Sequence, residues 1–240
     1  MCWLRARSHL LRYISSMHVT VAIMARCPSS QDVKTRLAGC LNSAQRAALY
    51  EAFLQDKLHT IRALPTVQGA IVYTPAERRE WFATQAGPNT RLHAQGDGDL
   101  GARVIAAFDT LFDAGASAVV LTDSDSPNLP TERLLEAVSA LRAGSELVLG
   151  PALDGGYYLV GLAHKRPALF DGVPWSTGAA FARTLRNARQ LGMQPCILPP
   201  WYDIDEPDDL AALAADITRG RGGACPRTEA GLRSLGWLPQ

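Results

Sequence analysis

The sequence predicts one α/β domain, built as a three-layer sandwich around a mostly parallel central sheet. Short continuous apolar runs alternate along the chain with longer segments whose apolar residues recur at helical spacing. Such strand–helix–strand alternation favours right-handed crossovers between parallel neighbours. The length of 240 residues and the 47% of apolar residues suit a single domain of the larger α/β kind.

The first half of the chain supplies strands and helices in alternation. Residues 19–25, VTVAIMA, form a short run rich in β-branched residues, which is typical of a buried strand. A helix capped by Asn42 or Ser43 is expected next. Residues 70–74 then predict a second strand, and residues 100–115 predict an amphipathic helix that ends at a glycine.

The second half continues the same alternation. Residues 117–122, SAVVLT, contain the continuous apolar run AVVL and predict a central strand. A helix over residues 131–144 follows, and two apolar runs at 146–150 and 157–162 predict two further strands. The remaining expected elements are a helix near 178–192, a strand at 195–199 and a helix near 208–218.

Charge is divided unevenly along a chain whose formal net charge is only +1. Residues 1–18 carry three arginines and no acid, and residues 219–240 carry four arginines and one glutamate, so each end contributes +3. Residues 19–218 therefore carry −5. We expect the folded domain at 19–218, between a basic N-terminal extension at 1–18 and a flexible tail at 219–240 that is rich in glycine and arginine.

Composition excludes several classes of protein. The small net charge argues against a bulk nucleic-acid binder, and no apolar run approaches the roughly 20 residues that cross a bilayer. The five cysteines lie far apart, with neither the paired spacing of zinc ligands nor an even disulfide framework. We therefore expect a cytoplasmic protein whose partners are small molecules rather than nucleic acid or a membrane.

Ligands of open α/β sheets bind beyond the carboxyl ends of the strands, so these ends are the places to look for chemistry. The first strand runs into ARCPSSQDVKTRL, in which Lys34 stands beside Thr35 and Arg36. Two cations and the loop amides could hold the phosphates of a nucleotide. A solvated basic turn before a helix has the same composition.

The central strand ends in LTDSDSPNLP. Asp123 and Asp125 are two residues apart, so on extended backbone both side chains face the same way. Two carboxylates at a strand end could bind Mg²⁺ or Mn²⁺ together with the oxygens of a diphosphate. Turn formation is the alternative, because Asp, Ser, Asn and Pro are also the residues that turns favour.

A second pair of carboxylates with the same spacing, Asp203 and Asp205, follows the strand expected at 195–199. A metal ion held between chain-distant carboxylates would join this segment to Asp125. Capping of the last helix is the alternative, with Asp205 or Glu206 as the cap. Both functions can be met at once by different carboxylates.

Two glycine-bearing segments complete the candidate site. Gly98 precedes a helix that carries Arg103 in its first turn, an arrangement that suits either an anion site or a tight turn. Asp154 precedes Gly155 and Gly156, where the backbone could approach a sugar or a base closely. A hairpin turn is the alternative for this second segment.

Six motifs, in order between about residues 19 and 212, resemble the radical-SAM/selenodomain-associated transferases. That family, usually labelled as glycosyltransferases, belongs to the nucleotide-diphospho-sugar transferase superfamily with the GT-A fold. The superfamily also contains molybdenum-cofactor-type and phospholactate-type nucleotidyltransferases, and VKTRL resembles the KSRL loop of the latter. The motifs are VKTRL, QGDGDLGAR, SDSPNLP, LGPALDGGYYLVGL, PWST and YDIDEPDDL.

The resemblance implies roles for the candidate residues. Lys34 and Arg36 would meet the nucleotide phosphates, and Asp125 would bind the metal ion with Asp203 or Asp205 as the second anchor. Asp154, with its two glycines, would line the acceptor or sugar pocket and is the candidate acceptor base.

The chain departs from the family pattern in two places. Ser30 and Gln31 stand where the family usually has Pro-Gly, which could move the loop amides away from the phosphates. Asp123 stands where a small residue is more usual, which completes an Asp-Ser-Asp triplet.

Three functions are compatible with these residues. The first is a Mg²⁺- or Mn²⁺-dependent glycosyltransferase that uses a nucleotide sugar and a small-molecule acceptor. The second is a nucleotidyltransferase that joins a nucleoside triphosphate to a phosphorylated small molecule and releases pyrophosphate. The third is a non-catalytic nucleotide-binding relative. Glycosyl transfer is the leading expectation, because the family label favours it.

Overall fold

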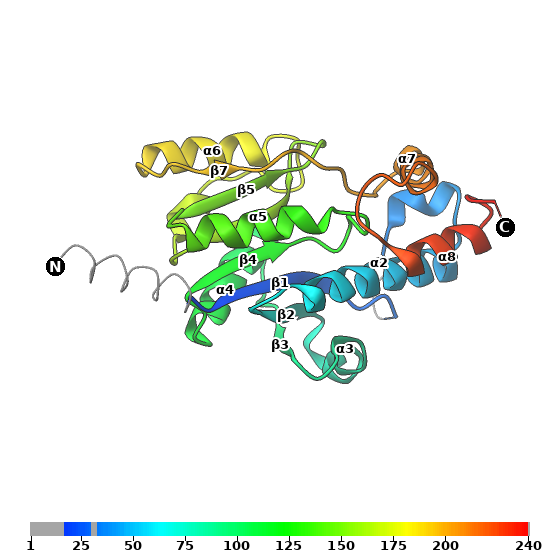
Figure 1. The fold of residues 1–240 in the computed structure, drawn as a ribbon, viewed down its shortest axis with the longest axis horizontal. Coiled ribbons are helices and arrows are strands. Elements are labelled where there is room, and N and C mark those ends of the chain that lie inside the picture. Colours follow the sequence, from blue (N-terminus) through cyan, green and yellow to red (C-terminus); the bar gives the residue numbers. More distant parts are fainter. Residues whose placement is uncertain (1–16, 30–32, 240) are drawn as a thin grey trace, which may run out of the picture.

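The computed structural model describes residues 17–29 and 33–239. They form one seven-stranded sheet with the order β3-β2-β1-β4-β6-β5-β7 (Figure 1). The predicted α/β domain with a mostly parallel sheet is confirmed. The strands are β1 Val19–Arg26, β2 Val67–Thr74, β3 Thr90–Ala94, β4 Ala118–Thr122, β5 Leu147–Pro151, β6 Tyr157–Leu162 and β7 Cys196–Ile197.

The chain changes direction across the sheet at β1. It runs outward through β2 and β3, and then returns to place β4 on the other side of β1, parallel to it. The carboxyl ends of β1 and β4 therefore diverge at a topological switch point, where open α/β sheets bind their ligands. β6 is the exception to the parallel arrangement, because it pairs antiparallel with both β4 and β5.

β3 was not expected from the sequence. Its residues, TRLHA, are mostly half-buried or exposed, since the strand lies at the edge of the sheet and pairs only with β2. An edge strand of this kind lacks the continuous apolar run by which buried strands are recognised.

Helices cover both faces of the sheet and bury two separate cores. Apolar side chains of α2 and α5 pack with those of β1 on one face, and those of α4 and α6 pack on the other face. The helices are α2 Ser43–Ala63, α3 Arg79–Ala86, α4 Leu100–Asp113, α5 Thr131–Arg142, α6 Ala180–Gln190, α7 Pro207–Thr218 and α8 Pro226–Ser234. Short 3₁₀ turns lie at η1 Thr35–Gly39, η2 Ala76–Arg78 and η3 Pro167–Phe170.

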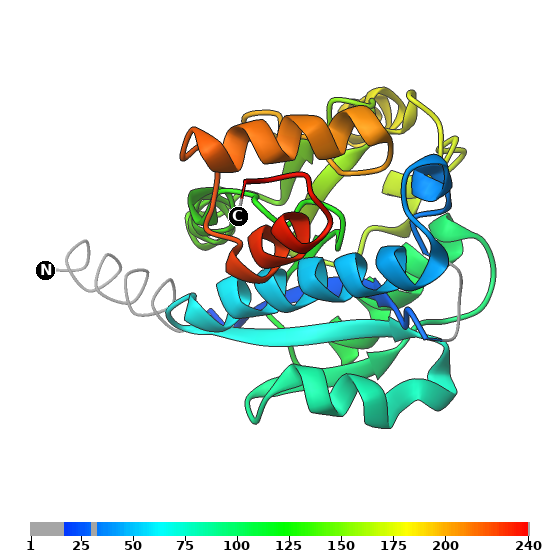
Figure 2. The same cartoon turned by 90° about the vertical axis from the view of Figure 1, so that its right-hand side faces the viewer.

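The predicted flexible tail at 219–240 is wrong for its second half. Helix α8 lies along α2, and the two views agree on this placement (Figure 2). Leu232 is fully buried in a third apolar cluster, which also holds Leu49 and Phe53 of α2 and Leu213 of α7. The apolar residues of 226–238 are separated by glycines, arginines and other polar residues, so the sequence did not reveal their helical pattern.

A buried carboxylate fastens α8 to α2. Asp56 of α2 is 1% exposed and accepts hydrogen bonds from the backbone N–H groups of Arg227 and Thr228, at 3.2 and 2.7 Å. These are N–H groups of the first turn of α8, which have no partner within their own helix. The side chain thus caps α8 from a distant part of the chain.

We expect Asp56→Ala to lower the free energy of unfolding by about 1–2 kcal/mol, since it removes this cap. Amide hydrogen exchange should speed up across residues 226–234 while the amides of β1 and β4 keep their protection. Asp208→Ala, which removes an exposed carboxylate at the start of α7, is the matched control. Equal exchange in α8 of the Asp56 variant and of the wild type would contradict the role.

The N-terminal extension predicted at 1–18 lies almost entirely outside the described residues. None of the helices in the part of the chain that the structure describes is long and apolar enough to cross a membrane.

Candidate active site

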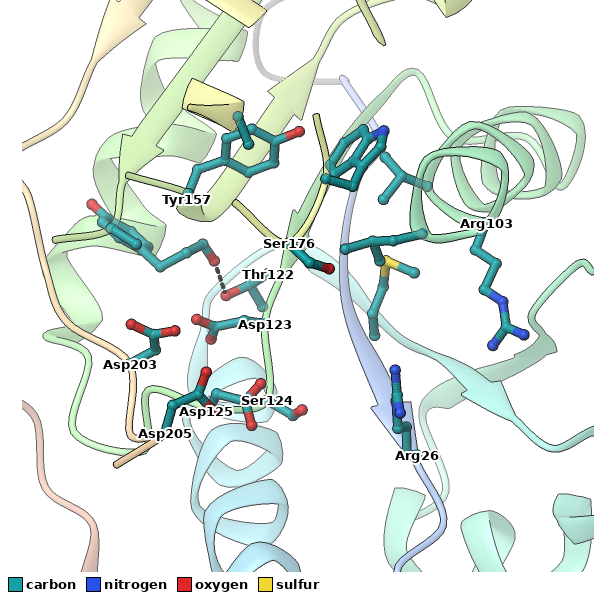
Figure 3. Close-up of a pocket in the computed structure, with 18 of the residues that line it drawn as sticks. Arg26, Arg103, Thr122, Asp123, Ser124, Asp125, Tyr157, Ser176, Asp203 and Asp205 are labelled. Carbon is teal, nitrogen blue, oxygen red and sulfur yellow. Dashed lines mark hydrogen bonds between the residues drawn. The ribbon is translucent and has the colours of Figure 1, made fainter. Parts of the chain in front are cut away.

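A cavity of about 790 Å³ opens at the carboxyl ends of β1 and β4. Asp123 and Asp203 lie on one side of it, and Arg26 and Arg103 lie on the other (Figure 3). The structure brings every predicted site residue except Gly155 to the lining of this one cavity, and Gly155 lies between two lining residues.

Lys34 ties three distant segments together at the cavity. Its side chain is 4% exposed, and its Nζ lies 2.5 Å from Oδ1 of Asp125 and 3.0 Å from Oδ1 of Asp205. The same ammonium donates to the carbonyl oxygen of Ile204 at 2.6 Å. Burial lowers the pKa of Lys34, but the charges of Asp125 and Asp205 outweigh this effect and hold the pKa above its ordinary value.

A side-chain cation therefore lies between the carboxylates of two segments that are distant along the chain. The sequence predicts a metal ion that joins Asp125 to the segment of Asp205, and in the structure the cation between them is the Lys34 ammonium. The backbone at Lys34 is left-handed, with φ of 51°, which is uncommon outside glycine and characteristic of functional loops. Arg36 is 64% exposed and reaches Asp205 at 3.5 Å, so it stays open to a ligand.

Asp123 has its own cation, which the sequence analysis missed. Lys57 of α2 is 1% exposed, and its Nζ donates to Oδ1 of Asp123 at 3.0 Å and to the carbonyl oxygen of Ser126 at 3.2 Å. The hydroxyl of Ser126 donates to the other carboxylate oxygen at 2.5 Å. The sequence does indicate a buried lysine at this position, because Lys57 lies among Leu54, Leu58 and Ile61 on one face of its helix.

Tyr50 and Arg26 are two further residues that the sequence analysis missed. The phenol oxygen of Tyr50 accepts from the backbone N–H of Arg26 at 3.0 Å and shares a hydrogen bond with the hydroxyl of Ser124 at 2.9 Å. This bond joins the ends of β1 and β4, between which the cavity lies. The Arg26 side chain is exposed at the last residue of β1 and lines the cavity.

Asp203 is a half-buried carboxylate of the cavity without a compensating cation. It forms no ion pair with any residue that the structure describes. Burial, followed by the negative charges of Asp154, Asp205 and Asp123, raises its pKa to about 7. An uncompensated carboxylate among other carboxylates favours a bound cation, so the residues fit a divalent ion.

No group of three or more His, Cys, Asp or Glu side chains within residues 17–29 and 33–239 is arranged to hold a metal ion unaided. Mg²⁺ is commonly held by one or two carboxylates and completed by substrate phosphates and water. Asp203 with a carboxylate from the end of β4 matches that smaller donor set.

The raised pKa of Asp203 predicts a pH dependence of stability. Between about pH 4 and pH 7 the folded chain keeps a proton that the unfolded chain has lost, so this group makes folding less favourable as the pH rises. We expect Asp203→Asn to raise the free energy of unfolding by a margin that grows from pH 4 to pH 7 and then levels off.

Urea unfolding without divalent cations measures this margin. The matched control is Asp171→Asn, an exposed carboxylate outside the cavity. A margin over the wild type that is the same at pH 4 and pH 8 would contradict the assignment.

The loop that carries Asp154 packs tightly against a second loop. Gly155 has φ of +89°, and a Cβ there would lie 2.1 Å from the carbonyl oxygen of Gly178. The backbone N–H of Phe181 donates to the carbonyl oxygen of Gly155 at 3.0 Å. Asp154 itself is exposed, and its Oδ1 accepts from the N–H of Gly156 at 2.7 Å. Only glycine at position 155 permits this approach.

The glycine-bearing segment before α4 is a helix start with its own cap. Asp99 accepts from the N–H of Ala102 at 2.9 Å, and the Arg103 side chain donates to the carbonyl oxygen of Gly98 at 2.9 Å. Trp175 lies so close to Gly101 that a Cβ there would lie 2.3 Å from the indole nitrogen. The indole thus packs the loop after β6 against α4.

A protein family described as "Uncharacterized protein conserved in bacteria (DUF2064)" matches residues 57–177. This match covers β2 to β6, from the buried Lys57 to the loop of Trp175. The chain belongs to the DUF2064 family.

Relatives of this DUF2064 protein are transferases. The 3-phospho-D-glycerate guanylyltransferase of Phenylobacterium zucineum is 30% identical over 195 residues, which cover 78% of this chain and 84% of the relative. The 2-phospho-L-lactate guanylyltransferase of Methanothrix thermoacetophila is 28% identical over 191 residues, with 77% and 79% covered. The DUF2064 protein is accordingly an enzyme of the transferase class.

A solved structure agrees in fold. A nucleotide-diphospho-sugar transferase-like protein from Desulfovibrio desulfuricans G20 superimposes with a TM-score of 0.81 at 32% identity, covering 91% of this chain and 95% of that one. The superfamily expected from the motifs is confirmed, whereas the link to radical-SAM and selenodomain proteins stays a prediction. The guanylyltransferase relatives favour the second of the three expected functions over the first, glycosyl transfer.

Proposed function

We propose that this DUF2064 protein is a metal-dependent nucleotidyltransferase that joins a nucleoside triphosphate, with GTP as the first candidate, to a phosphorylated small molecule. One observation carries the proposal: the cavity sets Asp203, a carboxylate without a cation, opposite the arginines at the end of β1 and the start of α4. The guanylyltransferase relatives support the choice of base.

The reaction needs charge neutralisation more than covalent chemistry from the protein. An oxygen of the acceptor phosphate attacks the α-phosphorus, the bond from the α-phosphorus to the bridging oxygen breaks, and pyrophosphate leaves. Arg26, Arg36 and Arg103 line the cavity and would stabilise the negative charge of the triphosphate. Lys34 holds the carboxylate of Asp125 in place through an ion pair, and Lys57 holds that of Asp123 in the same way.

A divalent cation, Mg²⁺ or Mn²⁺, would supply further neutralisation of the phosphates. Asp203 would hold it, together with Asp123 or Asp125 at the end of β4. Asp205 is the fourth predicted ligand, and its ion pairs with Lys34 and Arg36 make it a support of the loop in our proposal.

The test is to identify the leaving group. Purified protein is incubated with Mg²⁺ or Mn²⁺, a panel of acceptors, and either nucleoside triphosphates or nucleotide sugars. We expect pyrophosphate from GTP and no acceptor-dependent nucleoside diphosphate from nucleotide sugars. Release of nucleoside diphosphate would overturn the proposal in favour of glycosyl transfer, and binding without turnover would overturn it in favour of a non-catalytic role.

The matched variants are Asp203→Asn and Asp171→Asn, which remove one carboxylate inside and one outside the cavity. We expect the first to lower turnover and to raise the Mg²⁺ concentration that turnover requires, and the second to leave both unchanged. A chelator should stop turnover by the wild type, and added Mg²⁺ should restore it.

A further inference from the structure

The cavity is divided by charge into two parts. All of its lysines and arginines come from the end of β1, the loop that follows it, and α4. The other part is built by the loop before β6, the loop that carries Trp175, and Asp203. Its lining contains no lysine, arginine or histidine. The residues that line this cation-free part are Ala152, Asp154, Gly156, Tyr157, Trp175, Ser176, Thr177 and Asp203.

The cation-free part is a built subsite rather than an open surface. Its two loops are joined by the contact of Gly155 with Gly178 and by the hydrogen bond from the N–H of Phe181 to the carbonyl oxygen of Gly155. The rings of Tyr157 and Trp175 meet edge to face, with their centroids 5.9 Å apart. Both loops are therefore held in place before any ligand arrives.

The polar groups of this subsite suit hydroxyls. Asp154 uses one carboxylate oxygen on the N–H of Gly156, which leaves the other free to accept hydrogen bonds. Ser176 has a left-handed backbone, with φ of 59°, and Figure 3 shows its hydroxyl directed into the cavity. The Trp175 and Tyr157 rings supply an apolar wall beside these groups.

The same groups disfavour a carboxylate. The acceptors named for the guanylyltransferase relatives, 3-phospho-D-glycerate and 2-phospho-L-lactate, each carry a carboxylate besides the phosphate. In this chain such a group would lie near the carboxylate of Asp154 with no basic side chain of this part of the lining to neutralise it, while the divalent cation proposed at Asp203 would be engaged by the phosphates. Like charges at short range in a partly buried site repel.

We propose that the acceptor of this enzyme is a phosphorylated polyol or sugar, whose hydroxyl groups bind in the cation-free part of the cavity between Asp154 and Ser176. The inference rests on the proposed nucleotidyl transfer for the orientation of the acceptor, with its phosphate toward the triphosphate. The bonds formed and broken are those of that reaction.

Two probes distinguish a polyol phosphate from an acceptor that carries a carboxylate, because they share one three-carbon skeleton and differ in one group. Glycerol 3-phosphate has a CH₂OH group where 3-phosphoglycerate has a carboxylate. Each is titrated by calorimetry into the full chain with Mg²⁺ and a GTP analogue that cannot be cleaved between the α- and β-phosphates. We expect glycerol 3-phosphate to bind at least 10-fold more tightly. Equal binding, tighter binding of 3-phosphoglycerate, or no binding of either probe would overturn the inference.

Variants of Asp154 sharpen the test. Asp154 is exposed, so replacement leaves the core intact. We expect Asp154→Lys to shift the preference at least 10-fold toward 3-phosphoglycerate, and Asp154→Asn to give an intermediate preference. An unchanged preference in both variants would overturn the assignment.

Measurement of pyrophosphate release then distinguishes a failure of the inferred acceptor class from a failure of the proposed function. Pyrophosphate release with 3-phosphoglycerate but not with polyol phosphates would overturn the acceptor class and support nucleotidyl transfer. Selective binding of glycerol 3-phosphate without pyrophosphate release from any acceptor would support the subsite and overturn nucleotidyl transfer.

Discussion

Lys34→Met is expected to lower kcat/KM for GTP by about 10²-fold, the size of effect expected when the groups that position a substrate are displaced. The variant leaves Asp125 and Asp205 without their shared ammonium, which sits at 2.5 and 3.0 Å. The first loop then loses its attachment to the ends of β4 and the segment before α7. Arg36, on the same loop, would lose its position with it.

The matched control is Lys165→Met. Lys165 also contacts two carboxylates, Asp113 at 2.8 Å and Asp109 at 3.6 Å, but it lies at the surface outside the cavity. Initial rates are measured over a range of GTP concentrations, at a temperature where circular dichroism shows both variants folded. If Lys34→Met turns over as fast as Lys165→Met, the role of Lys34 at this site is wrong.

Lys57→Met is expected to have the largest effect on stability, a loss of about 3–5 kcal/mol in the free energy of unfolding, because it leaves one charge of a buried pair without its partner. Lys57 is 1% exposed, and Asp123 depends on it and on Ser126 for its hydrogen bonds. The carboxylate, which is 19% exposed at the cavity, would be left without its counter-charge.

Removal of both charges should restore much of this stability. In Lys57→Met with Asp123→Asn, the amide can still accept the hydrogen bond from Ser126, and no charge is left unpaired. Urea unfolding of the wild type, both single variants and the double variant gives the coupling between the two residues. A double variant that loses the sum of the two single losses would show that the pair is not coupled.

Most of the fold follows from patterns that are local in sequence. The run at 19–25 lies within β1, the run at 117–122 contains β4, and Asn42 caps α2 through a reciprocal pair of hydrogen bonds with Gln45. Each pattern depends on neighbours within a few residues, so the sequence displays it directly. β3 and α8 were not predicted, because distant segments make their environments. β3 lies at an edge of the sheet, and α8 packs on the outer side of α2.

The carboxylates and loop residues of the candidate site were predictable, but Arg26, Tyr50, Lys57 and the internal pairing of the site were not. Carboxylates at the ends of strands meet because parallel strands end at the same edge, so the cavity could be anticipated around Asp123 and Asp203. The partner of each carboxylate could not be anticipated. Lys57 is 66 residues from Asp123 along the chain, and Lys34 is 171 residues from Asp205.

The sequence by itself determined an α/β domain with acidic residues where its strands end and a basic loop after the first strand, because strand periodicity and residue type are local properties. Only the tertiary structure decided how those charges are combined. It pairs Lys34 with Asp125 and Asp205, pairs Lys57 with Asp123, and leaves Asp203 without a cation. Charge pairing depends on distances of a few ångströms between segments that the fold alone brings together, and these distances decide where a cation and an acceptor would bind.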